Sequence, residues 1–326
     1  MRGLLLDDVR ILAYHRVLES NEPDDFSFDL DLVSASADAF RAQMRYVRDA
    51  FQPMRFGELA DCLDRGQRPP KRALLVSFDD GYEDNHRIAF PILRELGMSA
   101  MFFVSTDHIA SGLPYAYDWF VHMLCIAPAG RLQLPELGID EPLPASLDQR
   151  RALAKRLLDR MKTLDALAQQ ALIRRLEGEW HLPRSDAPQG CRPMTWDAVR
   201  EMHAGGMEIG SHGRSHHMLS KLPPRQMRDE IFGSKHALEH ELGAPIDTLS
   251  YPVGGRDAYD STVIGLAREA GYRLACSYVA GTDPVVDASR YQMRRLPIER
   301  QMDAAWFRAM MALPEVFSYR TRLRNG

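Results

Sequence analysis

The run ALLVSFDDG, residues 73–81, joins an almost continuous apolar segment to two adjacent aspartates and a glycine. An apolar run of this length is typical of a strand that is buried on both faces, as in a parallel sheet. Asp79 and Asp80 then stand at the carboxyl end of that strand, where α/β folds display catalytic groups. An aspartate cap followed by a turn explains the same letters equally well, so the motif alone leaves both interpretations open.

Short apolar runs alternate with helical patterns on both sides of this motif, which favours a parallel β/α architecture. We expect further strands at 11–15, 99–106, 207–212, 247–252, 272–279 and 293–299. We expect helices at 38–50, 85–97, 194–206, 225–243 and 260–271, with Asp38 capping the first and Thr195 the third. The sequence therefore predicts an α/β fold, a distorted (β/α) barrel of about seven strands.

The alternation breaks between about 107 and 192. Proline-rich pieces are followed there by apolar residues at three- and four-residue steps, which predict a strongly helical segment over 147–176. Basic side chains of that segment are interleaved with aspartates, which indicates a solvated face rather than a polyanion site. We expect a single catalytic domain spanning 1–326, with a helical insertion at about 107–192 and a C-terminal helix and tail at about 303–326.

The composition is that of an ordinary globular protein, with 326 residues, 45% hydrophobic and 26% charged residues, and a net charge of −4. This charge gives no reason to expect a nucleic-acid partner. The four cysteines are far apart, and no signal-like segment is present, so we expect a cytoplasmic protein. The tail carries Arg320, Arg322 and Arg324 among apolar residues, and could contact a membrane surface weakly or simply pack as a last helix.

The segment SHGRSHH, residues 211–217, places three histidines close together after an expected strand. His212 and His216 are four residues apart, a spacing that lets both rings converge on one cation. His217 would point elsewhere, either supporting the site or exposed to solvent. A pair of partly exposed histidines explains the segment on its own, but two histidines with an aspartate from another strand end make a three-ligand site with room for a water.

Three motifs in this order, SFDDG at 77–81, SHGRSHHML at 211–219 and SYPVGG at 250–255, resemble those of the polysaccharide deacetylases of carbohydrate esterase family four. The segments ILAYHRV at 11–17 and DAFRAQMRYVRDAFQPMRFGEL at 38–59 resemble one branch of that family. This branch contains the biofilm poly-N-acetylglucosamine deacetylases and relatives from exopolysaccharide clusters.

The resemblance implies that Asp80, His212 and His216 bind a divalent metal. Zinc is the first choice for this ligand set, and cobalt, nickel or manganese are also accepted by two histidines and a carboxylate. Asp79 would be the general base that deprotonates the attacking water. The backbone N–H of Val253 would stabilise the oxyanion, at a position where many relatives have tyrosine.

Two further roles follow from departures from the family pattern. Many members supply a proton to the leaving amine from a histidine in a late Leu-x-His motif, and no histidine follows His240 here. In the branch with the N-terminal motif, a histidine at the end of the first strand fills this role, so the resemblance makes His15 the candidate acid. Without the resemblance, a buried histidine bonded to the backbone would be the preferred interpretation. The family often pairs an arginine with the base. We expect Arg295, rather than Arg294, to pair with Asp79, with a surface ion pair as the alternative.

Together with this resemblance, these residues imply a metal-dependent hydrolase that releases acetate from an N-acetylated amino sugar. The acetamido-sugar substrate could be nucleotide-linked, lipid-linked, an oligosaccharide or a glycoconjugate. Two alternatives remain at this point. One is a hydrolase of a non-sugar amide or ureide on the same scaffold, and the other is a carbohydrate-binding protein that has lost catalytic activity.

Overall fold

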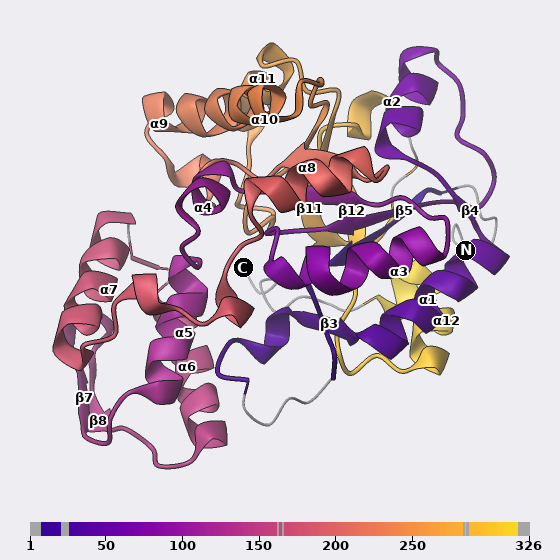
Figure 1. The fold of residues 1–326 in the computed structure, drawn as a ribbon. Coiled ribbons are helices and arrows are strands. Elements are labelled where there is room, and N and C mark those ends of the chain that lie inside the picture. The colour runs from indigo at the N-terminus through magenta and orange to yellow at the C-terminus, as the bar shows by residue number, and fades with distance from the viewer. Residues whose placement is uncertain are drawn as a thin grey trace. The chain divides into compact units, whose positions relative to one another are not determined.

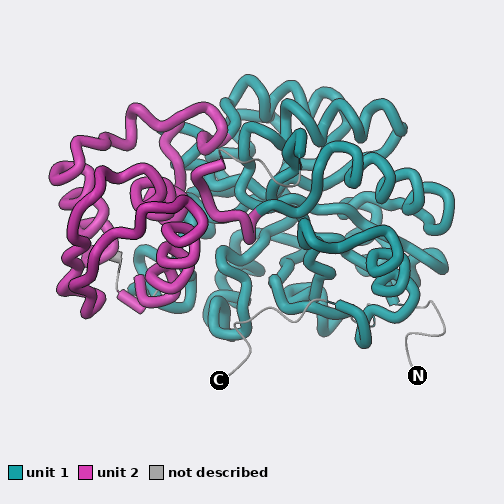
Figure 2. Tube along the Cα trace, turned by 90° about the horizontal axis from the view of Figure 1, so that it is seen from below, with its two compact units in different colours: residues 1–21, 33–111, 194–326 teal, residues 22–32, 112–193 magenta. Residues whose placement is uncertain are grey.

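A computed structural model describes residues 8–20, 26–161, 163–164, 166–282, 284 and 287–318. Contacts divide the chain into two compact units, coloured separately in Figure 2. Unit 1 is made of residues 1–21, 33–111 and 194–326, and unit 2 of residues 22–32 and 112–193. The prediction of one catalytic domain interrupted at about 107–192 stays a prediction.

Seven parallel strands of unit 1 close into a barrel, in the order β1-β12-β11-β10-β9-β6-β5 and back to β1. These strands are β1 (Arg10–Tyr14), β5 (Ala73–Phe78), β6 (Met101–Val104), β9 (Glu208–Ser211), β10 (Thr248–Ser250), β11 (Leu274–Ala280) and β12 (Met293–Pro297). The closing pair runs in register from Arg10↔Leu74 to Tyr14↔Phe78. The predicted barrel is confirmed, and residues 73–78 form the strand that the apolar run indicated.

Helices cover the outside of this barrel (Figure 1). They are α1 (Ala37–Ala50), α2 (Phe56–Asp64), α3 (Phe90–Glu95), α4 (Thr106–Ser111), α8 (Trp196–Ala204), α9 (Pro224–Arg228), α10 (Ser234–Leu242), α11 (Ser261–Glu269), α12 (Ala304–Ala312) and α13 (Pro314–Phe317). Short 3₁₀ turns lie at Leu219–Lys221 and Asp287–Ser289. The edge strand β4 (Gln52–Pro53) pairs with β5, and a small separate sheet joins β2 (Arg16–Leu18) to β3 (Val33–Ser36).

Local chemistry shifts several predicted boundaries. The first helix is capped by Ser36, whose Oγ accepts the N–H of Ala39 at 3.2 Å, and not by Asp38, which lies in the first turn. Thr195 caps α8 as expected. Two of the expected helices contain π-helical turns, at Asn85–Ala89 ahead of α3 and at Asp229–Gly233 between α9 and α10. Inserted π turns are common beside functional sites.

Unit 2 has its own apolar core. It contains α5 (Ala116–Ile126), α6 (Leu147–Met161), α7 (Ala166–Trp180), the antiparallel pair β7 (Arg131–Leu134) and β8 (Ile139–Pro142), and 3₁₀ turns at Leu30–Leu32, Pro135–Leu137, Arg184–Asp186 and Gln189–Cys191. The helical segment predicted over 147–176 is confirmed, and it is formed by two helices, α6 and α7, with a turn between them. Thr163 and Leu164 donate turn hydrogen bonds to Arg160 and Met161, which end α6 before α7 begins.

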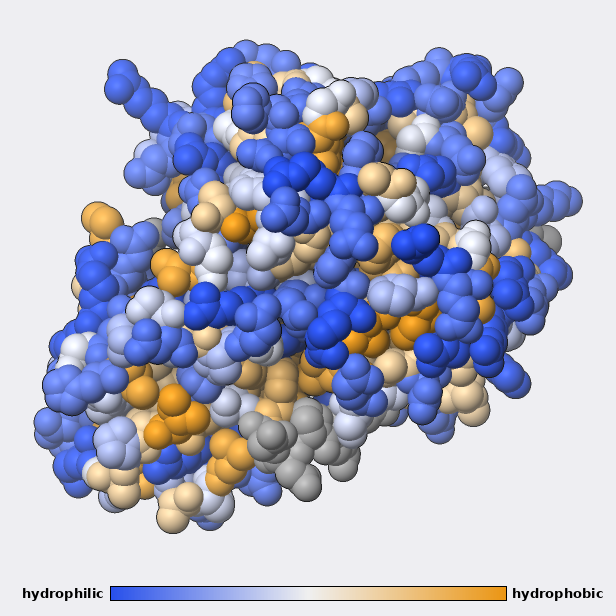
Figure 3. Space-filling model, viewed as in Figure 1, coloured by the Kyte–Doolittle hydropathy of each residue, from blue (hydrophilic) through white to orange (hydrophobic). Residues whose placement is uncertain are grey.

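No helix in the described ranges is long and apolar enough to cross a membrane. Hydrophilic residues cover most of the face drawn in Figure 3, with smaller apolar patches between them. Arg320, Arg322 and Arg324 lie outside the described residues, so whether the tail contacts a membrane surface or packs as a last helix stays open as in the sequence analysis. The same holds for the cytoplasmic location and the absence of a nucleic-acid partner.

The barrel core gives a first test. Phe102 is fully buried and stacks on Phe78, with ring centroids 4.7 Å apart. Phe102→Ala is expected to lower the free energy of unfolding by about 3–5 kcal/mol, because it removes buried contacts and leaves a cavity. Urea denaturation measures the loss. Val316→Ala, at a side chain that is 69% exposed, should change the same quantity by less than about 0.5 kcal/mol.

Candidate metal centre

The candidate site lies at the carboxyl ends of the unit 1 strands. Asp79 and Asp80 follow β5, His212 follows β9, and His15 follows β1. Because the barrel strands are parallel, these ends meet at one rim, which is the usual place for catalytic groups in such barrels. Ser250 ends β10 at the same rim.

Three predicted ligands converge there. Asp80 Oδ1 lies 3.4 Å from His212 Nε2 and 3.2 Å from His216 Nε2. One ligand atom from each of the three residues lies within 4.8 Å of the other two. Among the described residues, this is the group of histidine, cysteine and acidic side chains close enough to share a metal ion. A carboxylate oxygen and two imidazole nitrogens form a donor set that suits a divalent transition metal. The residues present therefore fit a metal ion.

Backbone groups and backbone conformation orient the three ligands. His212 Nδ1 lies 2.8 Å from the carbonyl oxygen of Ser250, and because a carbonyl only accepts, Nδ1 carries a proton and Nε2 is the ring nitrogen left to bind a cation. Asp80 and His216 adopt φ values of +74° and +60°. Such left-handed conformations cost about 1–3 kcal/mol at residues other than glycine and persist only where the surroundings impose them.

Asp79 and Arg295 form a fully buried bidentate pair. Arg295 Nη1 donates to Asp79 Oδ1 at 2.7 Å, and Nη2 donates to Oδ2 at 2.6 Å. Arg295 also donates to Ser250 Oγ at 2.9 Å and to the carbonyl oxygen of Ser277 at 2.8 Å. The expected partner of Asp79 is thus Arg295, whereas Arg294 contacts Thr282 and Glu315. The alternative of a surface ion pair is wrong, since Arg295 is 0% exposed.

This pair sets the charge of Asp79. Burial by itself raises the pKa of Asp79, but the guanidinium of Arg295 and the ring of His212 outweigh it, and the net pKa is lowered. The pKa of Arg295 is raised: its burial alone lowers the pKa, and Asp79 more than compensates. Asp79 is consequently an ionised carboxylate held in a fixed orientation, as a general base requires.

His15 lies at the same rim and is half-buried. Its Nδ1 lies 3.3 Å from the hydroxyl of Tyr278, and its backbone N–H donates to Ser34 Oγ at 3.0 Å. Its carbonyl accepts a hydrogen bond from Asn85 Nδ2 at 2.8 Å. Burial lowers the pKa of His15, and the nearby charges of Asp80 and Asp79 oppose this in part. The structure thus brings His15 into the electrostatic reach of both aspartates.

Val253 lies in a turn just after β10, with a φ of +65° that is unusual for a β-branched residue. The next residue, Gly254, has a carbonyl that accepts the N–H of Tyr278 at 2.7 Å. A Cβ added at Gly254 would lie 2.5 Å from Tyr278 Cβ, so only glycine lets the turn approach β11 this closely. The role of the Val253 N–H as an oxyanion donor stays a prediction.

Sequence reasoning missed three contributors. Ser250 binds both His212, through its carbonyl, and Arg295, through its hydroxyl. Tyr278 contacts His15, and Glu230 contacts the loop that carries His216. Ser250 lies in the quoted SYPVGG motif, but nothing in the motif reveals its partners. Tyr278 and Glu230 lie outside the quoted motifs, and nothing in the sequence marks them as part of the site.

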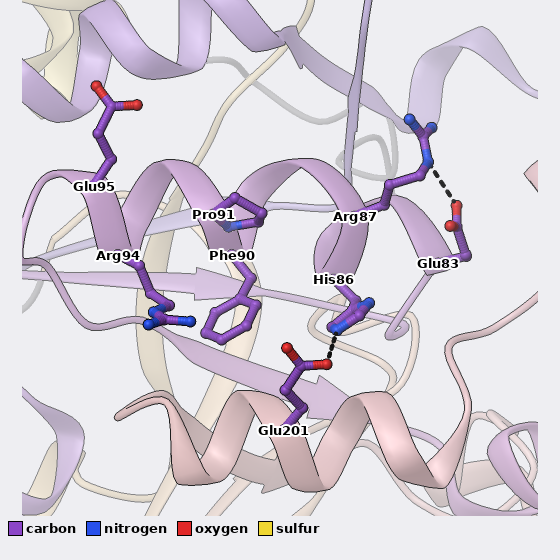
Figure 4. A pocket seen from close by; sticks show the side chains of 8 residues that line it. All are labelled: Glu83, His86, Arg87, Phe90, Pro91, Arg94, Glu95 and Glu201. Atoms are coloured by element: carbon purple, nitrogen blue, oxygen red, sulfur yellow. Dashed lines mark hydrogen bonds and ion pairs between the residues drawn. The ribbon is translucent and has the colours of Figure 1, made fainter.

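A separate groove of about 550 Å³ runs along α3 and is lined by Glu83, His86, Arg87, Phe90, Pro91, Arg94, Glu95 and Glu201 (Figure 4). His86 Nε2 pairs with Glu201 Oε2 at 2.9 Å, and Arg87 pairs with Glu83 at 3.2 Å. None of the predicted site residues lines this groove. Glu95 pairs with Arg41 and Arg45, which do not line the groove. The groove therefore does not change the assignment of the site.

Comparison with known proteins identifies the family of the chain. The sequence profile of the family described as polysaccharide deacetylase matches residues 66–128 and 142–275, more than half of the chain. The chain belongs to the polysaccharide deacetylase family. It is therefore a hydrolase that acts on amide bonds, as the motifs predicted. Its place in the branch with the N-terminal histidine motif stays a prediction.

Individual relatives of this deacetylase are distant in sequence. YxkH of Bacillus subtilis (strain 168), a protein named for the same family, is 21% identical over 300 residues, which cover 92% of this chain and 74% of YxkH. The deacetylase PplD of Streptococcus pyogenes, solved with acetate, superposes with a TM-score of 0.61 at 17% identity, covering 96% of this chain and 99% of PplD. A de-N-acetylase from Aggregatibacter actinomycetemcomitans gives 0.59 at 14% identity, covering 94% and 100%. These superpositions support the fold.

The buried pair predicts a large difference between two adjacent arginines of the deacetylase. Arg295→Met leaves the Asp79 carboxylate buried without its partner, so we expect a loss of about 3–5 kcal/mol in the free energy of unfolding. Arg294→Met removes a partly exposed side chain and should cost less than about 1 kcal/mol. Chemical denaturation of both variants measures the difference. Equal losses would show that the Asp79–Arg295 pair is not the buried contact described.

Proposed function

We propose that this protein is a metal-dependent N-deacetylase that releases acetate from an N-acetylated amino sugar. The observation that carries the proposal is the convergence of Asp80, His212 and His216 beside an ionised aspartate, Asp79, that Arg295 fixes in place. A three-ligand site next to a carboxylate base is the arrangement that hydrolysis of an amide by an activated water requires.

Asp80, His212 and His216 would hold the cation. Zinc is our first choice because two imidazoles and one carboxylate suit it, with cobalt, nickel and manganese as alternatives. When bound, the cation supplies Lewis acidity, which polarises an amide carbonyl and makes a neighbouring water more acidic.

The chain's own groups would move the protons and stabilise charge. Asp79, held ionised by Arg295, accepts a proton from the attacking water. The N–H of Val253 donates to the oxygen that gains negative charge, and this donor does not depend on the side chain at that position. His15 donates a proton to the nitrogen of the departing amine, while the hydroxyl of Tyr278 fixes its ring.

The substrate class follows from the family and from the chemistry together. The family hydrolyses acetamides of sugars, and PplD, named as a deacetylase, was solved with acetate. We propose an N-acetylated amino sugar as the substrate. Nucleotide-linked, lipid-linked and oligosaccharide forms are the probes to compare.

The proposal is tested by acetate release from N-acetylglucosamine oligomers and from a nucleotide-linked N-acetylamino sugar. We expect turnover with Zn²⁺ and loss of turnover after removal of the metal by a chelator, with recovery when Zn²⁺ is added back. Hydrolysis of a ureide or of a non-sugar amide alone would contradict the substrate class. Sugar binding without turnover of any probe would contradict the enzymatic role.

Asp79→Asn is expected to lower kcat by about 10²–10⁴-fold, because it removes the proton acceptor while leaving the three ligands in place. The variant should still bind Zn²⁺. Asp38→Asn, at a side chain that is 99% exposed on α1, is the matched control and should keep the wild-type rate. A full rate in Asp79→Asn would exclude this residue as the base.

His15→Gln tests the proton donor. An acid must be protonated to act, so the wild-type kcat/KM is expected to fall as pH rises through the pKa of His15, which burial lowers. His15→Gln should lose this fall and about 10²–10⁴-fold in rate. His86→Gln, at the surface pair with Glu201, is the control for histidine loss. An unchanged pH profile in His15→Gln would assign the acid to another group.

A further inference from the structure

We propose that Glu230 is a positioning residue for the metal centre, because its buried carboxylate holds the turn at Arg214–Ser215 so that His216 faces Asp80. The inference rests on the proposed function, since it assumes that the three ligands bind a cation. Glu230 lies in the π-helical turn Asp229–Gly233 and is 8% exposed. It would act through the backbone of the ligand loop and touch neither metal nor substrate.

The contacts of Glu230 with the loop are numerous for one side chain. Its Oε2 accepts the backbone N–H of Arg214 at 2.7 Å and that of Ser215 at 3.1 Å. Its Oε1 accepts the hydroxyl of Ser215. These three donors come from the two residues directly before His216. One carboxylate thus fixes both the direction of the backbone and a side chain of the turn.

The loop is also held from its other side. The N–H of Thr106 donates to the carbonyl of Gly213 at 3.2 Å, and the N–H of Asp107 donates to the carbonyl of Arg214 at 2.9 Å. The first residues of α4 therefore bind the loop carbonyls, while Glu230 binds the loop N–H groups. A Cβ added at Gly213 would lie 2.9 Å from Glu230 Oε2, so glycine at this position lets the carboxylate reach the turn.

Such bracing is needed because His216 adopts an unfavourable backbone conformation. Its φ of +60° costs about 1–3 kcal/mol and persists only if surrounding contacts impose it. Without the acceptor at Glu230, the N–H groups of Arg214 and Ser215 would turn toward water. We expect His216 to relax to a common backbone conformation and to lose its alignment with Asp80.

His217, the third histidine of the segment, contacts the groups that hold the loop. His217 Nδ1 lies 2.6 Å from Ser215 Oγ and 3.8 Å from Glu230 Oε1. His217 is therefore a neighbour of Glu230 and not a member of the group formed by Asp80, His212 and His216. Burial raises the pKa of Glu230, but the nearby ring of His217 and the hydrogen bonds from Ser215 and Arg214 outweigh it and lower the net pKa. An ionised carboxylate makes stronger hydrogen bonds to N–H donors than a neutral group does.

Substitution of Glu230 by Gln keeps the shape of the side chain and replaces one acceptor oxygen by a donor. The amide can no longer accept from all three loop donors. Mutation of a residue that orients a metal ligand through a hydrogen bond typically weakens metal binding by about 10–100-fold. We expect Glu230→Gln to weaken Zn²⁺ binding by a factor in this range.

Asp229→Asn is a matched control. Asp229 is the preceding residue, so the substitution makes the same change of charge at nearly the same place. Its carboxylate is 64% exposed and pairs with the side chain of Arg214, not with the loop backbone. A purely electrostatic effect on the cation would appear in both variants, whereas positioning would appear in Glu230→Gln alone.

The experiment measures Zn²⁺ affinity by competition with a chromophoric chelator and the visible spectrum of the Co²⁺-loaded protein. We expect Glu230→Gln to weaken Zn²⁺ binding and change the Co²⁺ spectrum, and Asp229→Asn to match the wild type in both. Ser215→Ala removes one of the three donors to Glu230 and should weaken Zn²⁺ binding by less than Glu230→Gln does. This variant tests the proposal if Glu230→Gln does not fold.

The outcomes separate the two claims. A wild-type protein that binds neither Zn²⁺ nor Co²⁺ would overturn the proposed metal centre itself. Wild-type affinity and spectrum in Glu230→Gln, with metal binding intact in the wild type, would overturn the role of Glu230 and leave the proposed function standing. For variants that do fold, thermal unfolding of the metal-free proteins shows whether any loss of affinity accompanies a general loss of stability.

Discussion

The parallel pairing of β1 with β5 brings residues from distant parts of the chain to one rim. Its register, from Arg10↔Leu74 to Tyr14↔Phe78, makes His15 and Asp79 the next residues on two adjacent strands. Closure also puts β12 beside β1, with Leu12 opposite Leu296. Arg295 is then carried on the neighbouring strand and reaches Asp79 inside the barrel. Without this closure, the acid and base candidates would have no common site.

The rim concentrates polar groups that would be costly to bury alone. Asp79 is stable there because Arg295 binds both of its oxygens and is itself bound by Ser250 and Ser277. A buried charge that keeps all its partners is tolerated, and one that loses its partner is strongly destabilising. Left-handed backbone at Asp80, His216 and Val253 adds strain at the same place. Such concentration of strain and buried charge is typical of functional sites.

Periodicity and short motifs were sufficient to predict the barrel, since buried parallel strands read as continuous apolar runs. They also supplied the residues that converge as a ligand set, because Asp80, His212 and His216 each follow a strand. The exact ends of the helices were not predictable, because they depend on which of several possible local hydrogen bonds form. Turn bonds from Thr163 and Leu164 separate α6 from α7, and Ser36 caps α1 in place of Asp38. The contacts that Ser250, Tyr278 and Glu230 make with the site residues depend on how distant segments pack, and the spacing of residues along the chain does not predict them.

The central claim is that Asp80, His212 and His216 together bind one divalent cation. Anomalous diffraction at the zinc edge, from crystals of the Zn²⁺-loaded protein, tests this directly. The account predicts one strong peak with Asp80 oxygen and the Nε2 atoms of both histidines at about 2.0–2.2 Å. A peak bound by other residues, or no peak at this rim in protein saturated with zinc, would contradict it.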